Sequence, residues 1–121
     1  MMHELNLEQI KDEASIQDFM KLDIRVGTIV EAEPFEKARK PAIKLSIDFG
    51  PLGTKRSSAQ ITARYTPDKL LGRQVVAIVN FPPRRIAGFD SEVLVLGGVP
   101  EEGDVVLLNT DEIIPNGTPI A

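Results

Sequence analysis

Between Ile24 and Leu108 the chain is built from short segments with the period of β-strands, and this pattern constrains the fold most strongly. Apolar residues occupy alternate positions in 24–32 and again in 42–49, as in strands that bury one face. Further strands are predicted over 55–62, 74–79, 92–96 and 105–108. Gly27, inside the first segment, predicts a bulge or a sharp coil of the sheet.

One short helix is predicted within this series of strands. Thr66 is its expected cap, Pro67 its first residue and Gly72 its end. Three strands, a helix and two strands within about 75 residues is the element order of an OB-fold. We therefore predict an all-β, five-stranded OB-fold barrel with short flanking helices and a C-terminal strand extension. Strands 2 and 3 and their loops form the usual ligand face of such barrels.

The N-terminal region is predicted to contain helical structure before the barrel begins. Ser15 and Asp18 have the spacing of a capping box, which favours a helix ending near Lys21. Leu7, Ile10 and Ala14 also recur at helical spacing, with Asn6 as a candidate cap. We divide the chain into an acidic N-terminal arm, residues 1–14, and an OB-fold domain, residues 15–121.

The residue inventory argues against a catalytic role. The 121 residues suffice for one domain and include no cysteine, which excludes disulfides and thiolate metal sites. The single histidine, His3, lies in the N-terminal tail, and no His/Asp/Glu set has metal-ligand spacing. We expect no enzymatic activity, no metal and no cofactor. The chain has neither a signal peptide nor an apolar stretch near the roughly 20 residues of a membrane span, so we expect a cytoplasmic protein.

The charge is unevenly distributed along the chain. Its net value is −4, yet Lys37–Arg85 holds eleven bases and two acids, a local charge of +9. The flanking residues carry −13. Such a separation can steer a polyanion despite the acidic total, whereas the alternative is that these charges only solvate the surface. The predicted second and third strands carry much of the basic and polar character, which favours a binding face.

The run Asn80–Gly98, NFPPRRIAGFDSEVLVLGG, is predicted to contain a binding loop. Pro82 and Pro83 lack N–H donors, so the preceding strand must end there. Arg84 and Arg85 then stand beside a stiff turn, where a planar guanidinium suits phosphate or carboxylate. The alternative is that these arginines pair with Asp90 and Glu92.

The candidate binding residues are basic or polar and lie in the middle of the chain. For RNA or peptide they are Lys40, Lys44, Arg56, Ser57, Ser58, Gln60, Arg64, Asn80, Arg84, Arg85 and Ser91. Consecutive strand residues face opposite ways, so at least one of the two serines at 57 and 58 is structural. Asn80 has an alternative structural role, bonding the turn backbone. Most aromatic residues are expected in the core, so RNA would be recognised by shape and backbone.

Longer motifs closely resemble the CsaA family, which comprises bacterial export-related chaperones built on a tRNA-binding OB domain. The matching runs are DFMKLDIRVGTIVEAEPF at 18–35, ARKPAIKLSIDFGPLG at 38–53, SSAQIT at 57–62 and LLGRQVVAIVNFPPRRIAGFDSEVLVLG at 70–97. VVLLN at 105–109 and PNG at 115–117 also fit. A looser similarity extends to the tRNA-binding appendage of methionyl-tRNA synthetase.

This resemblance implies an OB barrel with added helices at both ends, assembled as a homodimer through segments outside the barrel. It also implies two binding activities. One is binding of the tRNA elbow, which makes tRNA the first expected partner. The alternative is a chaperone role in protein export, with unfolded precursor proteins and the secretion motor SecA as partners.

Overall fold

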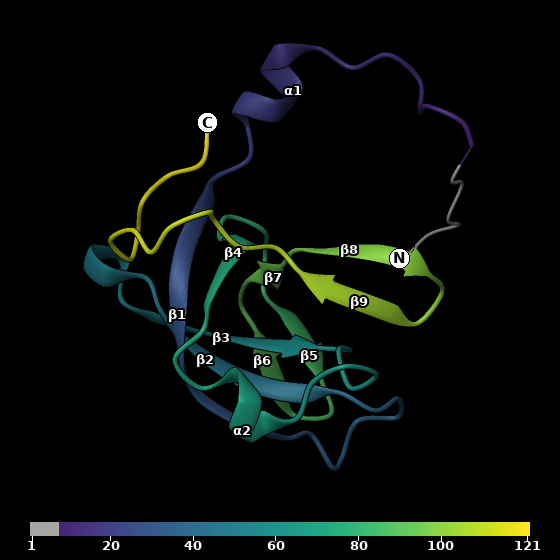
Figure 1. Ribbon diagram of the computed structural model, residues 1–121, viewed down its shortest axis with the longest axis vertical. Coiled ribbons are helices and arrows are strands. Elements are labelled where there is room, and N and C mark those ends of the chain that lie inside the picture. Colours follow the sequence, from purple (N-terminus) through teal and green to yellow (C-terminus); the bar gives the residue numbers. More distant parts are fainter. Residues whose placement is uncertain (1–7) are drawn as a thin grey trace.

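A computed structural model describes residues 8–121, and most of its regular structure is β-sheet (Figure 1). Five strands form the principal sheet in the order β3-β2-β1-β4-β7. Their bounds are β1 Ile24–Pro34, β2 Ile43–Asp48, β3 Thr54–Ala59, β4 Gln74–Ile78 and β7 Leu94–Val95. Two further sheets are hairpins, β5 Arg84–Ile86 with β6 Phe89–Ser91, and β8 Gly97–Glu101 with β9 Asp104–Leu107. The helices are α1 Ile16–Met20, α2 Pro67–Leu70 and the 3-10 turn η1 Gly50–Leu52.

The principal sheet curls until its outer strands nearly meet. The N–H groups of Glu92 and Val93 both donate to the carbonyl of Arg56 on β3, at 2.8 and 3.4 Å. The Arg56 N–H returns a bond to the Glu92 carboxylate at 2.9 Å. These bonds join β3 to the segment before β7, so the strands form a nearly closed barrel. The predicted all-β, five-stranded OB-fold is therefore confirmed.

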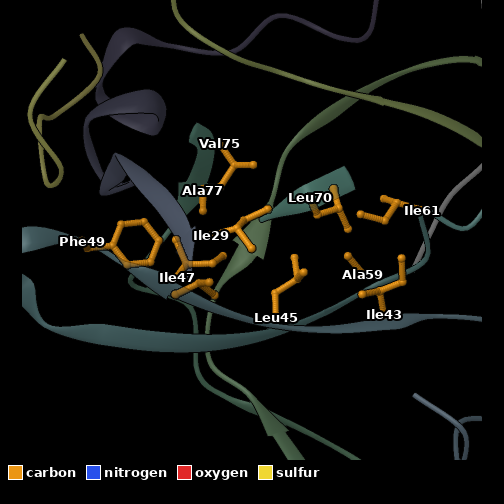
Figure 2. Close-up of a cluster of buried hydrophobic side chains, with 11 residues drawn as sticks. Ile29, Ile43, Leu45, Ile47, Phe49, Ala59, Ile61, Leu70, Val75 and Ala77 are labelled. Atoms are coloured by element: carbon orange, nitrogen blue, oxygen red, sulfur yellow. The ribbon is translucent and has the colours of Figure 1, made fainter. Parts of the chain in front are cut away.

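The barrel interior is apolar because β1, β2 and β4 direct alternate aliphatic side chains inward. Val76 and Ile78 of β4 face the other way and pack in a second cluster with Ile24 and Val26. β2 alternates buried and half-buried positions, as its sequence predicted, whereas all five residues of β4 are buried. The main cluster, part of which Figure 2 shows, comprises Ile29, Ile43, Leu45, Ile47, Phe49, Ala59, Ile61, Leu70, Val75, Ala77 and Val93. Leu70 comes from α2, so this short helix contributes a buried side chain to the barrel core.

Of the two alternatives predicted at Gly27, a bulge or a sharp coil of the sheet, the bulge is wrong in position. Gly27 pairs regularly with Val75, and the register of β1 against β2 shifts between Ile29 and Glu31 instead. Gly27 serves close packing: an added Cβ would lie 2.6 Å from Ile47 Cγ2 and 2.8 Å from the Phe49 ring. The absent side chain therefore makes room for the core residues of β2.

Several other local predictions were also corrected. Residues 8–14 form no helix. The predicted helical positions Asn6 and Leu7, and His3 in the tail, lie outside the described residues. The Ser15 capping box is present and α1 ends at Met20, close to the predicted end. Thr66 precedes Pro67 as expected, but its hydroxyl donates to the Asp68 carboxylate instead of capping α2.

Only the second strand of the β8–β9 hairpin was predicted, over 105–108. Contacts with the loop before α2 hold the hairpin against the barrel. The Arg64 guanidinium donates two hydrogen bonds to the Asp104 carboxylate, at 2.6 and 2.8 Å. This pairing lowers the pKa of Asp104 and raises that of Arg64. The Leu107 N–H also donates to the Tyr65 hydroxyl at 3.0 Å.

The C-terminal segment runs along β1 as an extended strand-like tail. Arg25 and Pro119 form an antiparallel bridge, and Val26 exchanges backbone hydrogen bonds with Gly117 and Thr118. The predicted C-terminal strand, 105–108, corresponds to β9, whereas this contact of the tail with β1 was not predicted. A C-terminal helix, which the resemblance implied, is absent from residues 108–121. The backbone bonds to β1 explain the extended conformation, because they use the groups that a helix would pair internally.

We expect Gly27→Ala to lower the free energy of unfolding by about 1–3 kcal/mol, because the new methyl group overpacks the core at Ile47 and Phe49. Denaturant unfolding measures the change. Gly98→Ala is the matched control, since its added Cβ has Val106 O as nearest neighbour at 3.9 Å. The control should change stability by about 0.5 kcal/mol or less. Equal midpoints for the two variants would contradict the packing role of Gly27.

Candidate nucleic-acid interface

The outward face of β2 and β3 carries a group of polar and basic side chains. The register pairs Lys44 with Ser58 and Ser46 with Arg56, so these four residues lie on one face of the sheet. Their neighbours along the strands, such as Leu45 and Ser57, point into the barrel. The alternation that builds the core therefore also collects this polar face.

The β5–β6 hairpin stands beside this face, and two grooves meet at its turn. Arg84 and Arg85 were predicted in a loop, but they belong to β5 because Arg84 pairs with Ser91 and Arg85 with Asp90. Alternation along the strand separates the two arginines. Arg84 lines a groove, whereas Arg85 forms an ion pair with Asp90 at 2.9 Å. Of the pair, Arg84 is the cation available to a ligand.

The first groove has a volume of about 690 Å³ and is lined by cations without any acidic residue. We call it the cationic groove; its lining residues are Ala38, Arg39, Lys40, Ala42, Ser58, Gln60, Arg84, Ile86 and Ala87. Within residues 8–121, its three cations form no ion pair. Three unpaired positive charges around a concave surface favour a ligand with several anionic groups.

The second groove has a volume of about 540 Å³ and mixed charge. We call it the aromatic groove; its lining residues are Glu33, Pro34, Phe35, Glu36, Lys37, Lys44, Arg56, Ala87, Gly88 and Phe89. Two phenylalanines form its floor, with ring centroids 5.3 Å apart in an edge-to-face arrangement. Both rings are about 95% buried, at 5% exposure each, which confirms that they belong to the core.

Two cations cover these rings. The Lys44 ammonium lies 5.4 and 5.5 Å from the centroids of Phe35 and Phe89, and the Arg56 guanidinium lies 4.2 Å from that of Phe89. These distances are typical of cation–π contacts. Lys44 also forms an ion pair with Glu33 at 3.1 Å, whereas Arg56 forms none within residues 8–121.

The turn that separates the grooves has an uncommon backbone conformation. Ala87 and Gly88 lie between the paired residues Ile86 and Phe89, and both have positive φ, 47° and 82°. This two-residue turn matches the right-handed twist of a hairpin, but it normally selects glycine or asparagine. Ala87 is the non-glycine residue with positive φ among residues 8–121, and it lines both grooves. Strain of this kind often occurs at functional sites.

Four predicted site residues make structural contacts away from the two grooves. Ser57 was wrong as a ligand contact: it is 1% exposed and its hydroxyl donates to the Val93 carbonyl at 2.9 Å. The Ser91 hydroxyl accepts from the Ser58 N–H. Asn80 has a structural role, but its amide bonds the backbone of residues 21 and 23 instead of the turn backbone that was predicted. The guanidinium of Arg64 is held by Asp104, as described above.

Six other predicted residues line the two grooves. Lys40, Ser58, Gln60 and Arg84 line the cationic groove, and Lys44 and Arg56 line the aromatic groove. Sequence reasoning missed Arg39 and Lys37 as groove residues. Both belong to the basic run KARK, which was the available signal, but the position of this loop beside the hairpin is a tertiary feature.

Residues 24–119 match the family model described as "Putative tRNA binding domain". The chain belongs to this family. Among curated relatives, the methionine--tRNA ligase of Methanococcoides burtonii is 37% identical over 108 residues, which is 89% of this chain and 16% of the ligase. The chain therefore spans about one sixth of the length of that relative, and the family that they share is the tRNA-binding domain.

Solved structures identify the type of tRNA-binding domain. The chaperone CsaA from Bacillus anthracis is 63% identical, with a TM-score of 0.88 over 91% of this chain and 100% of that one. The CsaA chaperone protein from Picrophilus torridus is 48% identical, with a TM-score of 0.83 over 90% and 100% of the two chains. This domain is therefore of the CsaA type, as its motifs predicted.

Residues 8–121 contain neither a metal-ion site nor a membrane-spanning helix. No group of three or more His, Cys, Asp or Glu side chains in this part of the chain is arranged to hold a metal ion. None of its helices is long and apolar enough to cross a membrane.

Proposed function

We propose that this domain binds tRNA in the cytoplasm, and that its role is binding and not catalysis. The observation that carries the proposal is the cationic groove, where Arg39, Lys40 and Arg84 surround a concavity without an acidic residue. The family match to a tRNA-binding domain supports RNA as the polyanion. The groove also lies beside β3, on the face where OB-folds commonly bind oligonucleotides.

The groove is suited to contacts with phosphate groups along an RNA backbone. Its walls come from three separate segments, which are the 35–42 loop, β3 with its following residues, and β5 with its turn. The loop supplies Arg39 and Lys40, and β5 supplies Arg84. Arg84 is held by the β5–β6 ladder, so little of its backbone freedom is lost on binding. Ser58 and Gln60 add neutral hydrogen-bonding groups. Binding should therefore depend on charge and RNA shape, with recognition concentrated on the backbone.

We expect Arg84→Ala to weaken tRNA binding about three- to tenfold at low salt, because one phosphate contact is lost. The slope of log K against log salt should also become shallower by about 0.7–0.9. Filter binding of tRNA across a salt series measures both quantities. Lys69→Ala is the matched control, since Lys69 lies on α2 outside both sets of groove-lining residues. A flat salt response of the unmodified protein, or equal losses in the two variants, would contradict the proposal.

A second candidate function is a chaperone role in protein export, with unfolded precursor proteins and SecA as partners. The two similar CsaA structures, from Bacillus anthracis and Picrophilus torridus, are of chaperones. Apolar surface also accompanies the basic residues, because Ile86 lines the cationic groove and Phe81, just before the hairpin, is 41% exposed. An unfolded chain would contact such apolar residues while its acidic groups meet the nearby cations.

We expect Phe81→Ser to reduce suppression of client aggregation, because it removes exposed apolar surface, and to leave tRNA affinity unchanged. Arg84→Ala should instead weaken tRNA binding and leave the suppression of client aggregation unchanged. Light scattering of a heat-unfolded client at moderate salt measures the chaperone activity. If the unmodified protein fails to delay aggregation even in molar excess, the chaperone candidate is excluded while the tRNA proposal stands.

We also propose that the chain forms a homodimer, with α1 in the interface. This helix buries none of its own residues against the barrel; Ile16 and Met20 are 65% and 71% exposed. A helix this short is not stable in isolation, so packing against a second chain would stabilise it. In Figure 1, α1 lies at one end of the long axis and α2 at the other. A pair of chains would double the number of grooves and add avidity for a large ligand.

We expect the unmodified protein to sediment at twice the 13.3 kDa mass of one chain. Met20→Lys should raise the dimer Kd about tenfold or more, because it places a charge in an apolar contact. Leu71→Lys is the matched control: Leu71 is 53% exposed but follows α2, far from α1. Sedimentation velocity at micromolar concentration distinguishes the outcomes. A monomeric unmodified protein would refute the dimer.

A further inference from the structure

The cation–π contact of Arg56 creates a flat platform in the aromatic groove. Its guanidinium lies over Phe89, 4.2 Å from the ring centroid, while the ring itself is buried beneath the cations. Arg56 is nevertheless an exposed residue, so the side of the guanidinium away from the ring is accessible from the groove. Guanidinium planes, like aromatic rings, stack with nucleic-acid bases.

The backbone of Arg56 is fixed more firmly than that of an ordinary surface residue. Its N–H donates to the Glu92 carboxylate, and its carbonyl accepts from the Glu92 and Val93 N–H groups. Glu92 therefore holds the main chain and leaves the guanidinium without a carboxylate partner within residues 8–121. A planar cation held over a ring, with its outer side open, is preorganised for a stacked ligand.

The charges of the two grooves favour different parts of a nucleotide. The cationic groove has three basic side chains and no acidic one. The aromatic groove has Glu33 and Glu36 beside its three basic side chains. Lys44 is already paired with Glu33. Carboxylates repel phosphate but accept hydrogen bonds from base amino groups. Because the grooves meet at Ala87, a phosphate in one groove can be joined to a base in the other.

We propose that the aromatic groove binds one unpaired RNA base, stacked on the Arg56 guanidinium, while the adjoining phosphates lie in the cationic groove. This inference rests on the proposed tRNA binding and specifies which part of the RNA enters each groove. It modifies the expectation that recognition is confined to shape and backbone. The protein lacks exposed aromatic rings in this groove, and Arg56 supplies the stacking surface in their place.

The test uses the full chain and an RNA hairpin whose single-stranded loop carries 2-aminopurine, with an otherwise identical RNA that is abasic at this position. Arg56→Lys keeps the charge and removes the plane. We expect this variant to bind the 2-aminopurine RNA about 5- to 50-fold more weakly, with an unchanged salt slope and loss of the stacking-dependent fluorescence change. On the abasic RNA, variant and unmodified protein should bind equally. Arg39→Lys, in the cationic groove, is the matched control and should retain the fluorescence change.

Three results would overturn the inference. In the first, Arg56→Lys binds the 2-aminopurine RNA as tightly as the unmodified protein. In the second, it loses the same affinity on the abasic RNA, which would assign Arg56 to phosphate contact. In the third, RNA binds without any fluorescence change, and Arg56→Lys weakens the binding of an acidic peptide. That result would assign the groove to peptide. Failure of the tRNA proposal itself differs from all three, because the unmodified protein would then bind neither RNA.

Discussion

The hydrogen bonds that close the barrel between β3 and residues 91–93 hold the β5–β6 side of the candidate interface against β3. Glu92 and Val93 bond the backbone of Arg56, the Ser57 hydroxyl reaches the Val93 carbonyl, and the Ser91 hydroxyl accepts from Ser58. These bonds bring the β5–β6 hairpin beside the outward face of β2 and β3. Without them, Arg84 and Arg56 would lie on separated parts of the sheet, and the two grooves would not form.

The same closure explains why neighbouring residues have different roles. Strand alternation directs Ser57 inward to a structural bond and Ser58 outward to the cationic groove. Along β5, it leaves Arg84 available while Arg85 pairs with Asp90. The basic residues are thus divided between structural pairs and open sites. The basic residues that cluster in the middle of the sequence are therefore distributed over two grooves. The charged side chains of one groove are all cationic, whereas those of the other have both signs.

Much of the fold could be predicted from the sequence. The alternation in 24–32 and 42–49, the single short helix and the order of strands were enough to identify the OB-fold, because burial of one strand face requires that period. The β5–β6 hairpin was missed since Pro82 and Pro83 indicated a loop, and its two-residue turn contains Ala87, which is not a typical turn residue. Gly27 indicated a bulge, whereas it actually makes room for Ile47 and Phe49.

The sequence by itself determined the chemical character of the site. The tertiary structure decided which residues belong to it. The +9 charge between Lys37 and Arg85, and the polar residues of the second and third strands, indicated a basic binding face. The sequence could not determine that Asp104 would hold Arg64, that Asn80 would bond the backbone near α1, or that Arg56 would lie over Phe89. Each of these contacts joins residues more than thirty positions apart, and such pairings depend on how the barrel closes, which no local pattern of residues encodes.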